Sequence, residues 1–223
     1  MTRPPEESQG ESVARSANHA PDLGDPNGSP PFYDKHISMA HGAGGEASRR
    51  LVEGLIRPLL ANAWLNPLAD AAILPAQTGK LAVTTDSFVV QPLRFPGGSI
   101  GELAIHGTVN DLAVSGARPI AITASLILEA GLSTEILRQE IAAMAAAAER
   151  LGLPVVAGDT KVVEHGKADG MYICTTGLGA VHARADLRVD RVGPGDRVLL
   201  SGPIGNHGMA VMLARAELEI ETE

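Results

Sequence analysis

The stretch that decides the fold, STEILRQEIAAMAAAAERLGLPVVAGDTK, covers residues 133–161 and predicts a helix followed by a strand. Ser133 is a favourable N-cap, and Gly152 is typical of the position just beyond a helix C-terminus. Between them, apolar side chains recur every three or four residues, at Leu137, Ile141, Met144, Ala148 and Leu151. The strand is predicted over Leu153–Ala157, and Gly158-Asp159-Thr160-Lys161 is expected to leave its end. This order of elements predicts an α/β (α+β) protein.

The rest of the chain from Ile37 alternates in the same way between helical and extended patterns. Helices are predicted over Ala47–Leu60 and Ser99–Ser115, the second closed by Gly116 and Pro119. Strands are predicted over Leu81–Thr85, Phe88–Val90, Pro119–Leu128 and Met171–Val181. The aspartate at position 86 lies between the first two of these strands and is therefore expected at or near a strand end.

Composition divides the chain into three parts. Residues 1–35 are rich in Pro, Ser, Gly, Asn and acidic residues, so we expect a disordered arm. Residues 36–190 hold the helix and strand patterns and are expected to form the N-terminal domain. Residues 191–223 offer only a strand at Arg197–Ser201 and a helix at about Met209–Leu218. That is too little for an independent core, so we expect the start of an incomplete second α/β domain.

Charge and composition exclude several classes of partner. The 223 residues carry a net charge of −8 with a pI near 5.4, which argues against a nucleic-acid or anionic membrane surface. No stretch approaches the roughly 20 apolar residues of a membrane-spanning helix, and residues 1–34 contain no apolar segment of a signal peptide. The single cysteine, Cys174, excludes a disulfide within the chain and fits a reducing compartment. We therefore expect a cytoplasmic protein in which Cys174 is a small buried side chain.

Three separated aspartates follow a glycine-rich run. The run is HGAGG at residues 41–45, and the aspartates lie in the later motifs TTDS, NDLAVSG and GDTK. Mg²⁺ prefers hard oxygen ligands, and proteins usually supply one or two carboxylates while phosphates and water supply the rest. The backbone of a glycine-rich turn can approach phosphate oxygens closely. The pattern predicts a magnesium–triphosphate site whose residues are Gly42, Gly44, Gly45, Asp86, Asp111 and Asp159.

The same residues also have structural explanations. The glycine run does not match the Walker or dinucleotide-binding patterns, and short glycine clusters are usually turns. His41 could contact phosphate, although a structural histidine with satisfied ring nitrogens is the commoner case. Asp111 could be a solvated side chain, but aspartate is disfavoured inside a helix and therefore suggests a function. Lys161 could neutralise phosphate or carry a proton, or could pair with Asp159 or Glu164, and its spacing leaves both interpretations open.

Five motifs in chain order carry a resemblance to a known family. They are HGAGG at 41–45, TDSFVV at 85–90, FPGGSIG at 95–101, NDLAVSGA at 110–117 and GDTKVV at 158–163. Together they resemble the HypE carbamoyl dehydratases of hydrogenase maturation, relatives of aminoimidazole ribonucleotide synthetase, selenophosphate synthetase and thiamine monophosphate kinase. The resemblance spans Ile37 to about Leu218. It implies the N-terminal fold of aminoimidazole ribonucleotide synthetase, with a mixed sheet and helices on one side. It also implies that residues 36–190 bind ATP and form a homodimer in which two sheets pair.

The resemblance also implies a reaction. In this family, ATP phosphorylates the oxygen of a carbamoyl group carried on a C-terminal cysteine. Loss of phosphate leaves a thiocyanate, whose cyano group goes to the iron of NiFe hydrogenase. Matched to this sequence, Asp86, Asp111 and Asp159 would hold magnesium and triphosphate, Asn110 would help to position them, and Lys161 would handle a proton or charge at the amide. The implied partners are the carbamoyltransferase HypF and the HypC–HypD scaffold complex.

The sequence departs from the family at its C-terminal end. The family ends in a Pro-Arg-x-Cys tail, whereas this sequence ends in ELEIETE. We therefore expect that the 223-residue chain does not complete the dehydration alone. The alternative is a non-catalytic fragment that serves dimerisation or partner docking. Such a fragment would form a dimer but would show no Mg²⁺-dependent nucleotide binding. A small-molecule kinase of the same superfamily is a third hypothesis, which phosphate transfer to a free metabolite would support.

Overall fold

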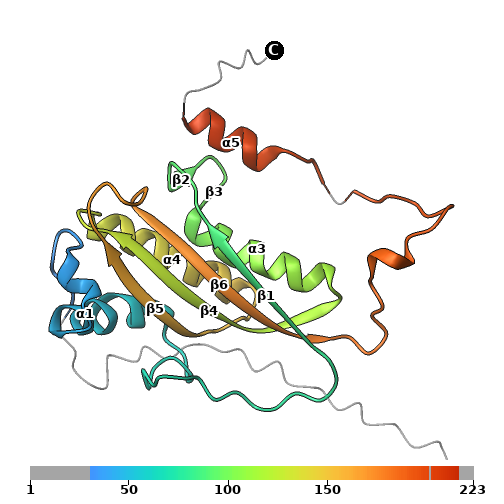
Figure 1. Cartoon of the computed structure of the whole chain (residues 1–223), viewed down its shortest axis with the longest axis horizontal. Coiled ribbons are helices and arrows are strands. Elements are labelled where there is room, and N and C mark those ends of the chain that lie inside the picture. Colours follow the sequence, from blue (N-terminus) through green and yellow to red (C-terminus); the bar gives the residue numbers. More distant parts are fainter. Residues whose placement is uncertain (1–30, 201, 216–223) are drawn as a thin grey trace, which may run out of the picture.

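One four-stranded sheet forms the centre of the molecule (Figure 1). The computed structural model describes residues 31–200 and 202–215. The strands of the sheet are β1 (Leu81–Phe88), β4 (Ala117–Glu129), β5 (Val155–Val163) and β6 (Met171–Val181). Their order across the sheet is β1-β6-β4-β5, with β4 and β5 parallel and the other neighbours antiparallel. The sheet is therefore mixed, and β1 and β5 are its two edges.

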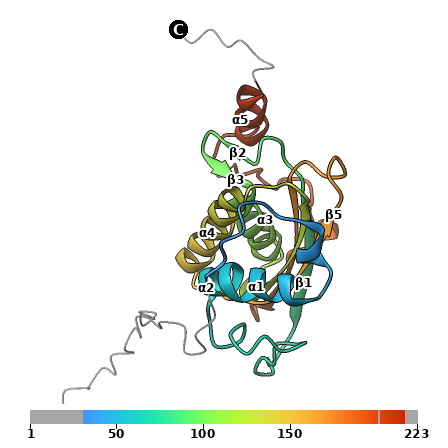
Figure 2. The same cartoon turned by 90° about the vertical axis from the view of Figure 1, so that its left-hand side faces the viewer.

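Two long helices, α3 (Ile100–Val114) and α4 (Thr134–Arg150), cover one face of this sheet (Figure 2). Strand side chains alternate between faces, so every second residue of a strand points toward these helices. On β4 these residues include Ala124, Leu126 and Leu128, and all three are buried. The opposite face of the sheet carries no helix within the described residues, and we call it the open face. The predicted α/β fold with helices on one side is confirmed.

The helix α4 matches its predicted apolar stripe almost completely. Its side chains at Leu137, Ile141, Met144 and Ala148 are buried in the core, whereas Leu151 is exposed. Leu151 is the C-cap residue, one position beyond the last residue of the helix. No helix within residues 31–200 and 202–215 combines the length and the apolar character that crossing a membrane requires.

Short helical segments lie beside the β5 edge (Figure 1). They are η1 (Met39–Gly42), α1 (Glu46–Leu51), the π-helical turn η2 (Val52–Ile56) and α2 (Arg57–Leu60). From α1 to α2 the backbone stays helical throughout, which confirms the helix predicted over Ala47–Leu60. Leu51 and Leu55 of this run are fully buried, so they anchor it to the core.

A small hairpin of β2 (Arg94–Phe95) and β3 (Gly98–Ser99) precedes α3 and carries α5 (Asn206–Ala214). The rings of Phe95 and His207 meet edge to face with their centroids 5.2 Å apart. Arg215 Nε donates to the Gln91 carbonyl at 2.6 Å. The helix begins three residues earlier than predicted, at Asn206, and η3 (Val189–Arg191) lies between β6 and α5. Residues 216–218 of the predicted helix lie outside the described residues.

Four local predictions are wrong. β1 is one strand that runs through Asp86 and ends at Phe88, rather than two strands that flank Asp86, and Asp159 lies inside β5 rather than beyond its end. Asp86 itself, two residues before the end of β1, does lie near a strand end as predicted. The strand predicted over Arg197–Ser201 is missing from residues 197–200, where the apolar side chains are largely exposed and lack a neighbouring strand among the described residues. Cys174 is not buried but half-exposed, and its side chain lies on the open face. An apolar or β-branched run makes a strand only where another strand offers its backbone groups.

The folded part of the chain begins before the predicted boundary at residue 36. Phe32 is buried in the core, and the Asp34 carbonyl accepts a hydrogen bond from Thr134 Oγ1 at 2.5 Å. The Lys35 carbonyl accepts a second one from the Thr134 amide at 3.0 Å. The folded domain therefore includes at least residues 32–35. The remainder of the predicted arm, residues 1–30, lies outside the described residues.

The start of α3 packs very closely against α4. A Cβ on Gly101 would lie 2.1 Å from the Glu140 carbonyl oxygen, so no side chain fits there. The carboxylate of Glu140 is fully buried at the same place. Its Oε2 accepts a hydrogen bond from the Gly101 amide at 3.1 Å, and Arg94 Nε lies 2.7 Å from its Oε1. This negative charge at the N-terminus of α3 complements the helix dipole and fixes both helices to the hairpin.

Candidate nucleotide and metal site

Asp86 and Asp111 come together where β1 contacts α3. Asp86 points toward the helix, since its Oδ2 lies 3.6 Å from the position that a Cβ on Gly107 would take. Asp111 is four residues after Gly107 and therefore lies on the same face of α3. Its Oδ2 accepts a hydrogen bond of 2.9 Å from Thr84 Oγ1. Thr84 and Asp86 share one face of β1 because they are two residues apart, so the two carboxylates belong to one cluster.

Buried threonines fix α3 against the sheet directly below this cluster. Thr108 of α3 and Thr175 of β6 are joined through their hydroxyl groups, and both side chains are buried. Thr175 is also the neighbour of Asp86 in the β1–β6 register. The helix and the two strands are therefore locked together beside Asp86. Asn110 is exposed on α3 directly before Asp111, so it is available to a ligand of the cluster.

A second group of predicted residues lies at the β5 edge. Gly42 runs so close to this strand that a Cβ would lie 2.5 Å from the Val162 amide nitrogen. Glycine is therefore required there by space alone. Gly44 has a φ of +78° and donates its amide to Ser48 Oγ at 2.9 Å. A Cβ on Gly44 or Gly45 would meet nothing within 4 Å, so this part of the loop is open to a ligand.

Asp159 and Lys161 of β5 form an ion pair on the sheet. Lys161 Nζ lies 3.3 Å from the Asp159 carboxylate, and both side chains are more than half exposed. The pairing that offered a structural explanation for Lys161 is therefore present. Surface ion pairs of this kind contribute little to stability, so both groups remain available to a ligand.

These two groups lie at opposite edges of the sheet, and Asp159 and Lys161 also lie on the opposite face from Asp86, whereas Gly42 packs against Val162, the register partner of the buried Leu128. Asp159 shares its row across the strands with Ser125, Cys174 and Ser87, on the open face. Asp86 is the neighbour of Ser87 in β1 and therefore points the other way, toward α3. Three strand spacings, about 14 Å, separate β1 from β5. Within the described residues, no three His, Cys, Asp or Glu side chains gather as a metal site.

One chain therefore brings only part of the predicted site together. Asp86, Asp111 and Asn110 meet at the contact of β1 with α3. The glycine run, Asp159 and Lys161 all lie at the β5 edge instead, the run beside Val162 and the two charged residues on the open face. Neither group alone contains all three predicted carboxylates.

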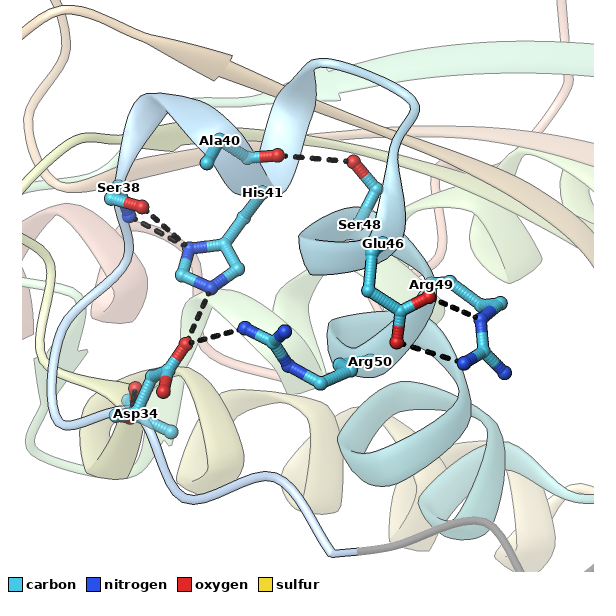
Figure 3. A network of polar contacts seen from close by, with 9 residues as sticks. Asp34, Ser38, Ala40, His41, Glu46, Ser48, Arg49 and Arg50 are labelled. Carbon is cyan, nitrogen blue, oxygen red and sulfur yellow. Dashed lines mark hydrogen bonds and ion pairs between the residues drawn. The ribbon is translucent and has the colours of Figure 1, made fainter.

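His41 is a structural residue, as Figure 3 shows. Its ring is buried, and Nδ1 accepts a hydrogen bond from the Ser38 amide at 2.9 Å. The proton therefore lies on Nε2, which donates to Asp34 Oδ2 at 2.9 Å. The hydrogen bond from His41 lowers the pKa of Asp34, and the nearby Arg50 guanidinium acts in the same direction. Both ring nitrogens are used in hydrogen bonds within the chain, so His41 anchors the start of the glycine run to Ser38 and Asp34.

Glu129, at the end of β4, holds the loop between β5 and β6. Its carboxylate accepts hydrogen bonds from the amides of Gly166 at 2.6 Å and Gly170 at 3.0 Å. These two bonds, the Gly166 one above all, lower the pKa of Glu129. His165 Nδ1 lies 3.1 Å from the same carboxylate. The sequence gives no local signal for this role, because the partners are 36 to 41 residues further along the chain.

A cavity of about 570 Å³ lies between the hairpin, α3 and α5. Phe95, Glu102, His106 and His207 are among its lining residues. None of the predicted site residues borders it. We therefore do not assign the candidate site to this cavity. The candidate site consists of the Asp86–Asp111 cluster at β1 and α3, together with Asp159, Lys161 and the glycine run at β5.

This fold and cluster define the class of protein. The chain belongs to the family of AIR synthase related proteins, whose N-terminal domain matches residues 68–181. That match confirms the predicted fold family.

Within this class, the chain is similar to HypE proteins. Carbamoyl dehydratase HypE of Azotobacter vinelandii is 48% identical over 187 residues, which make up 84% of this chain and 55% of that protein. A crystal structure of hydrogenase maturation protein HypE in complex with ATP matches with a TM-score of 0.71 at 43% identity, over 82% of this chain and 54% of that one. A crystal structure of a HypE–HypF complex matches with a TM-score of 0.63 at 46% identity, over 77% and 55%.

These similarities confirm the resemblance to HypE that the five motifs indicate. The chain spans about half the length of the relatives it matches.

Proposed function

We propose that this chain is the ATP-binding part of a carbamoyl dehydratase that serves hydrogenase maturation. The observation that carries the proposal is the cluster of Asp86 and Asp111 at the contact of β1 with α3. It occurs in a chain that is similar to HypE over most of its length, and one of the matched HypE structures contains ATP. The reducing cytoplasm is the compartment we propose, in keeping with a single free cysteine.

The donor set of the cluster fits Mg²⁺. Two carboxylates on rigid elements offer hard oxygen ligands, and phosphate oxygens and water would complete the coordination. Asp86 and Asp111 would hold the ion, and Asn110 beside them would contact the phosphates. When bound, Mg²⁺ neutralises charge on the triphosphate.

The complete site would use two copies of the chain. Asp159, Lys161 and the glycine run lie about 14 Å from β1 within one chain, which is too far for a shared metal ion. In a homodimer, the β5 group of one copy would meet the β1 group of the other. The exposed apolar side chains of Leu81 and Val83 support this, since both lie on the open face of edge strand β1.

In the proposed reaction, the γ-phosphoryl group of ATP passes to the oxygen of a carbamoyl group on a cysteine sulfur. The bond between that carbon and oxygen then breaks, phosphate leaves, and the amide nitrogen loses its protons, so that a thiocyanate remains. Phosphorylation makes a poor leaving oxygen a good one, and positioning supplies much of the catalysis. Lys161, next to Asp159, is the residue we propose for handling a proton or charge at this amide.

The proposed partners are a HypF-type carbamoyltransferase, which would supply the carbamoyl group, and a HypC–HypD scaffold, which would receive the cyano group. The matched HypE–HypF complex supports the first of these. A second candidate function is dimerisation or partner docking without catalysis. The exposed apolar residues of β1 favour it as well, because they fit a dimer contact whether or not nucleotide binds.

Calorimetric binding of ATP with and without Mg²⁺ distinguishes the two. We expect magnesium-dependent binding that Asp111→Asn weakens by about tenfold or more, because the variant loses a charged ligand. Glu149→Gln removes a charge from an exposed position of α4 and is the control, with unchanged binding expected. Dimer formation without any magnesium-dependent binding would contradict the dehydratase and support the docking fragment.

A further inference from the structure

We propose that Thr84 is a positioning residue for the metal and nucleotide site, because it fixes the carboxylate of Asp111 beside Asp86. The proposal rests on the function proposed above. Thr84 itself would touch neither the metal ion nor the nucleotide. Its role would be to hold one oxygen of Asp111, so that the other oxygen is presented to the ion in a constant orientation.

The geometry of Thr84 suits this role. Its Oγ1 donates to Asp111 Oδ2 at 2.9 Å, across the contact between β1 and α3. Its methyl group packs over Gly177 of β6, where a Cβ would lie only 3.4 Å from Thr84 Cγ2. A β-branched side chain has few χ1 rotamers, and this packing restricts them further. The hydroxyl group is thereby aimed at α3.

Asp111 is exposed on α3, and among the described residues Thr84 is the only one that donates a hydrogen bond to its carboxylate. Ser115 Oγ bonds to the Asp111 carbonyl at 2.8 Å, which involves the backbone and not the carboxylate. A hydrogen bond to a charged carboxylate is stronger than one between neutral groups, so a single donor suffices to select a rotamer. Without it, the carboxylate would have to be ordered when the ion binds, at a cost in affinity.

The surrounding contacts make Thr84 a fixed reference point. Thr108 and Thr175 lock α3 onto β6 next to Asp86, and Gly107 brings the helix backbone close to Asp86 Oδ2. The helix cannot shift along β1 without breaking these contacts. Thr84 and Asp86, two residues apart on β1, therefore keep a constant distance from Asp111.

The test compares Thr84→Val, which removes only the hydroxyl, with Thr84→Ser, which keeps it. Calorimetric titration gives the Mg²⁺ concentration at which ATP binding is half-maximal, and thermal unfolding reports stability. We expect Thr84→Val to raise that concentration roughly three- to tenfold, with Thr84→Ser close to the unmodified chain. Thr108→Val is the structural comparison, and it should lower the melting temperature more than it changes the magnesium requirement.

The outcomes separate this inference from the function on which it rests. If Asp111→Asn abolishes magnesium-dependent binding and Thr84→Val leaves the magnesium requirement unchanged, the role of Thr84 is wrong and the site stands. A serine variant as impaired as the valine variant would also overturn the role, because the hydroxyl would then not be the acting group. If the unmodified chain shows no magnesium-dependent binding, both the proposed function and the role of Thr84 fall.

Discussion

At the residue scale, one carboxylate decides how the loop between β5 and β6 is held. Glu129 accepts the amides of Gly166 and Gly170, and these bonds require its ionised form. They lower its pKa from the ordinary 4.5, the Gly166 bond contributing most. The carboxylate therefore contributes stability in full above the unfolded-state pKa. This contribution is lost as the pH falls through the lower folded-state pKa.

We predict that Glu129→Gln lowers stability at neutral pH and that the difference from the unmodified chain shrinks on acidification. Urea unfolding of both proteins at several values between about pH 3 and pH 7 measures this. The difference should be constant above pH 4.5 and decrease below it. Glu164→Gln, on the same loop but exposed, is the control and should show little effect. A difference that stays constant down to the lowest pH would contradict the assignment.

Some site residues are predictable from sequence and others are not. Asp86, Asp111 and Asp159 stand out because each is a charged residue in a small or apolar run. Thr84 and Glu129 do not, because their partners are 27 to 41 residues away in sequence. A threonine in a strand and a glutamate at its end are ordinary on their own. Only the contact between distant segments gives them a role.

At the scale of elements, the placement of α3 depends on its first turn. Gly101 lies against the α4 backbone, and the buried Glu140 carboxylate accepts its amide. Asp111 lies ten residues further along the same helix, so a displacement at its start would also move the candidate site. The contact between α3 and α4 therefore links the core to function.

We predict that Gly101→Ala destabilises the protein by about 2–4 kcal/mol, because its Cβ would overlap the Glu140 carbonyl and the backbones would have to separate. Chemical denaturation measures the loss. Gly208→Ala in α5 is the matched control, since its Cβ would meet nothing within 4 Å. Alanine also favours a helix more than glycine does, so the control should lose no stability. Equal stabilities for the two variants would show that α3 and α4 are not packed this closely.

The elements themselves could largely be predicted. The stripe of α4 and the apolar strand β6 are found where the sequence pattern places them, because both are buried by their neighbours in the expected way. The pattern failed at β5, which continues through Asp159 to Val163. An edge strand with an open face tolerates polar residues, so a polar run there resembles a loop. It also failed at residues 197–200, where an apolar run has no strand beside it among the described residues.

At the scale of the whole molecule, the arrangement of the sheet separates the predicted site into two groups. β1 with α3 carries Asp86, Asp111 and Asn110, and the β5 edge carries Asp159, Lys161 and the glycine run. The motifs give the chemistry of these residues but not their distance across the sheet. Strand order is decided by long-range pairing, which no local pattern contains. Two copies of the chain are what we propose to unite the groups.

A hybrid dimer tests this central claim most directly. One copy would carry Asp111→Asn and the other Asp159→Asn, each with its own affinity tag, and only dimers with both tags would be purified. Each variant alone should lose magnesium-dependent ATP binding in calorimetry. The hybrid should regain binding at about half the sites of the unmodified dimer, because one of its two sites is then intact. A hybrid that binds no more ATP than either variant alone would contradict a site shared between two copies.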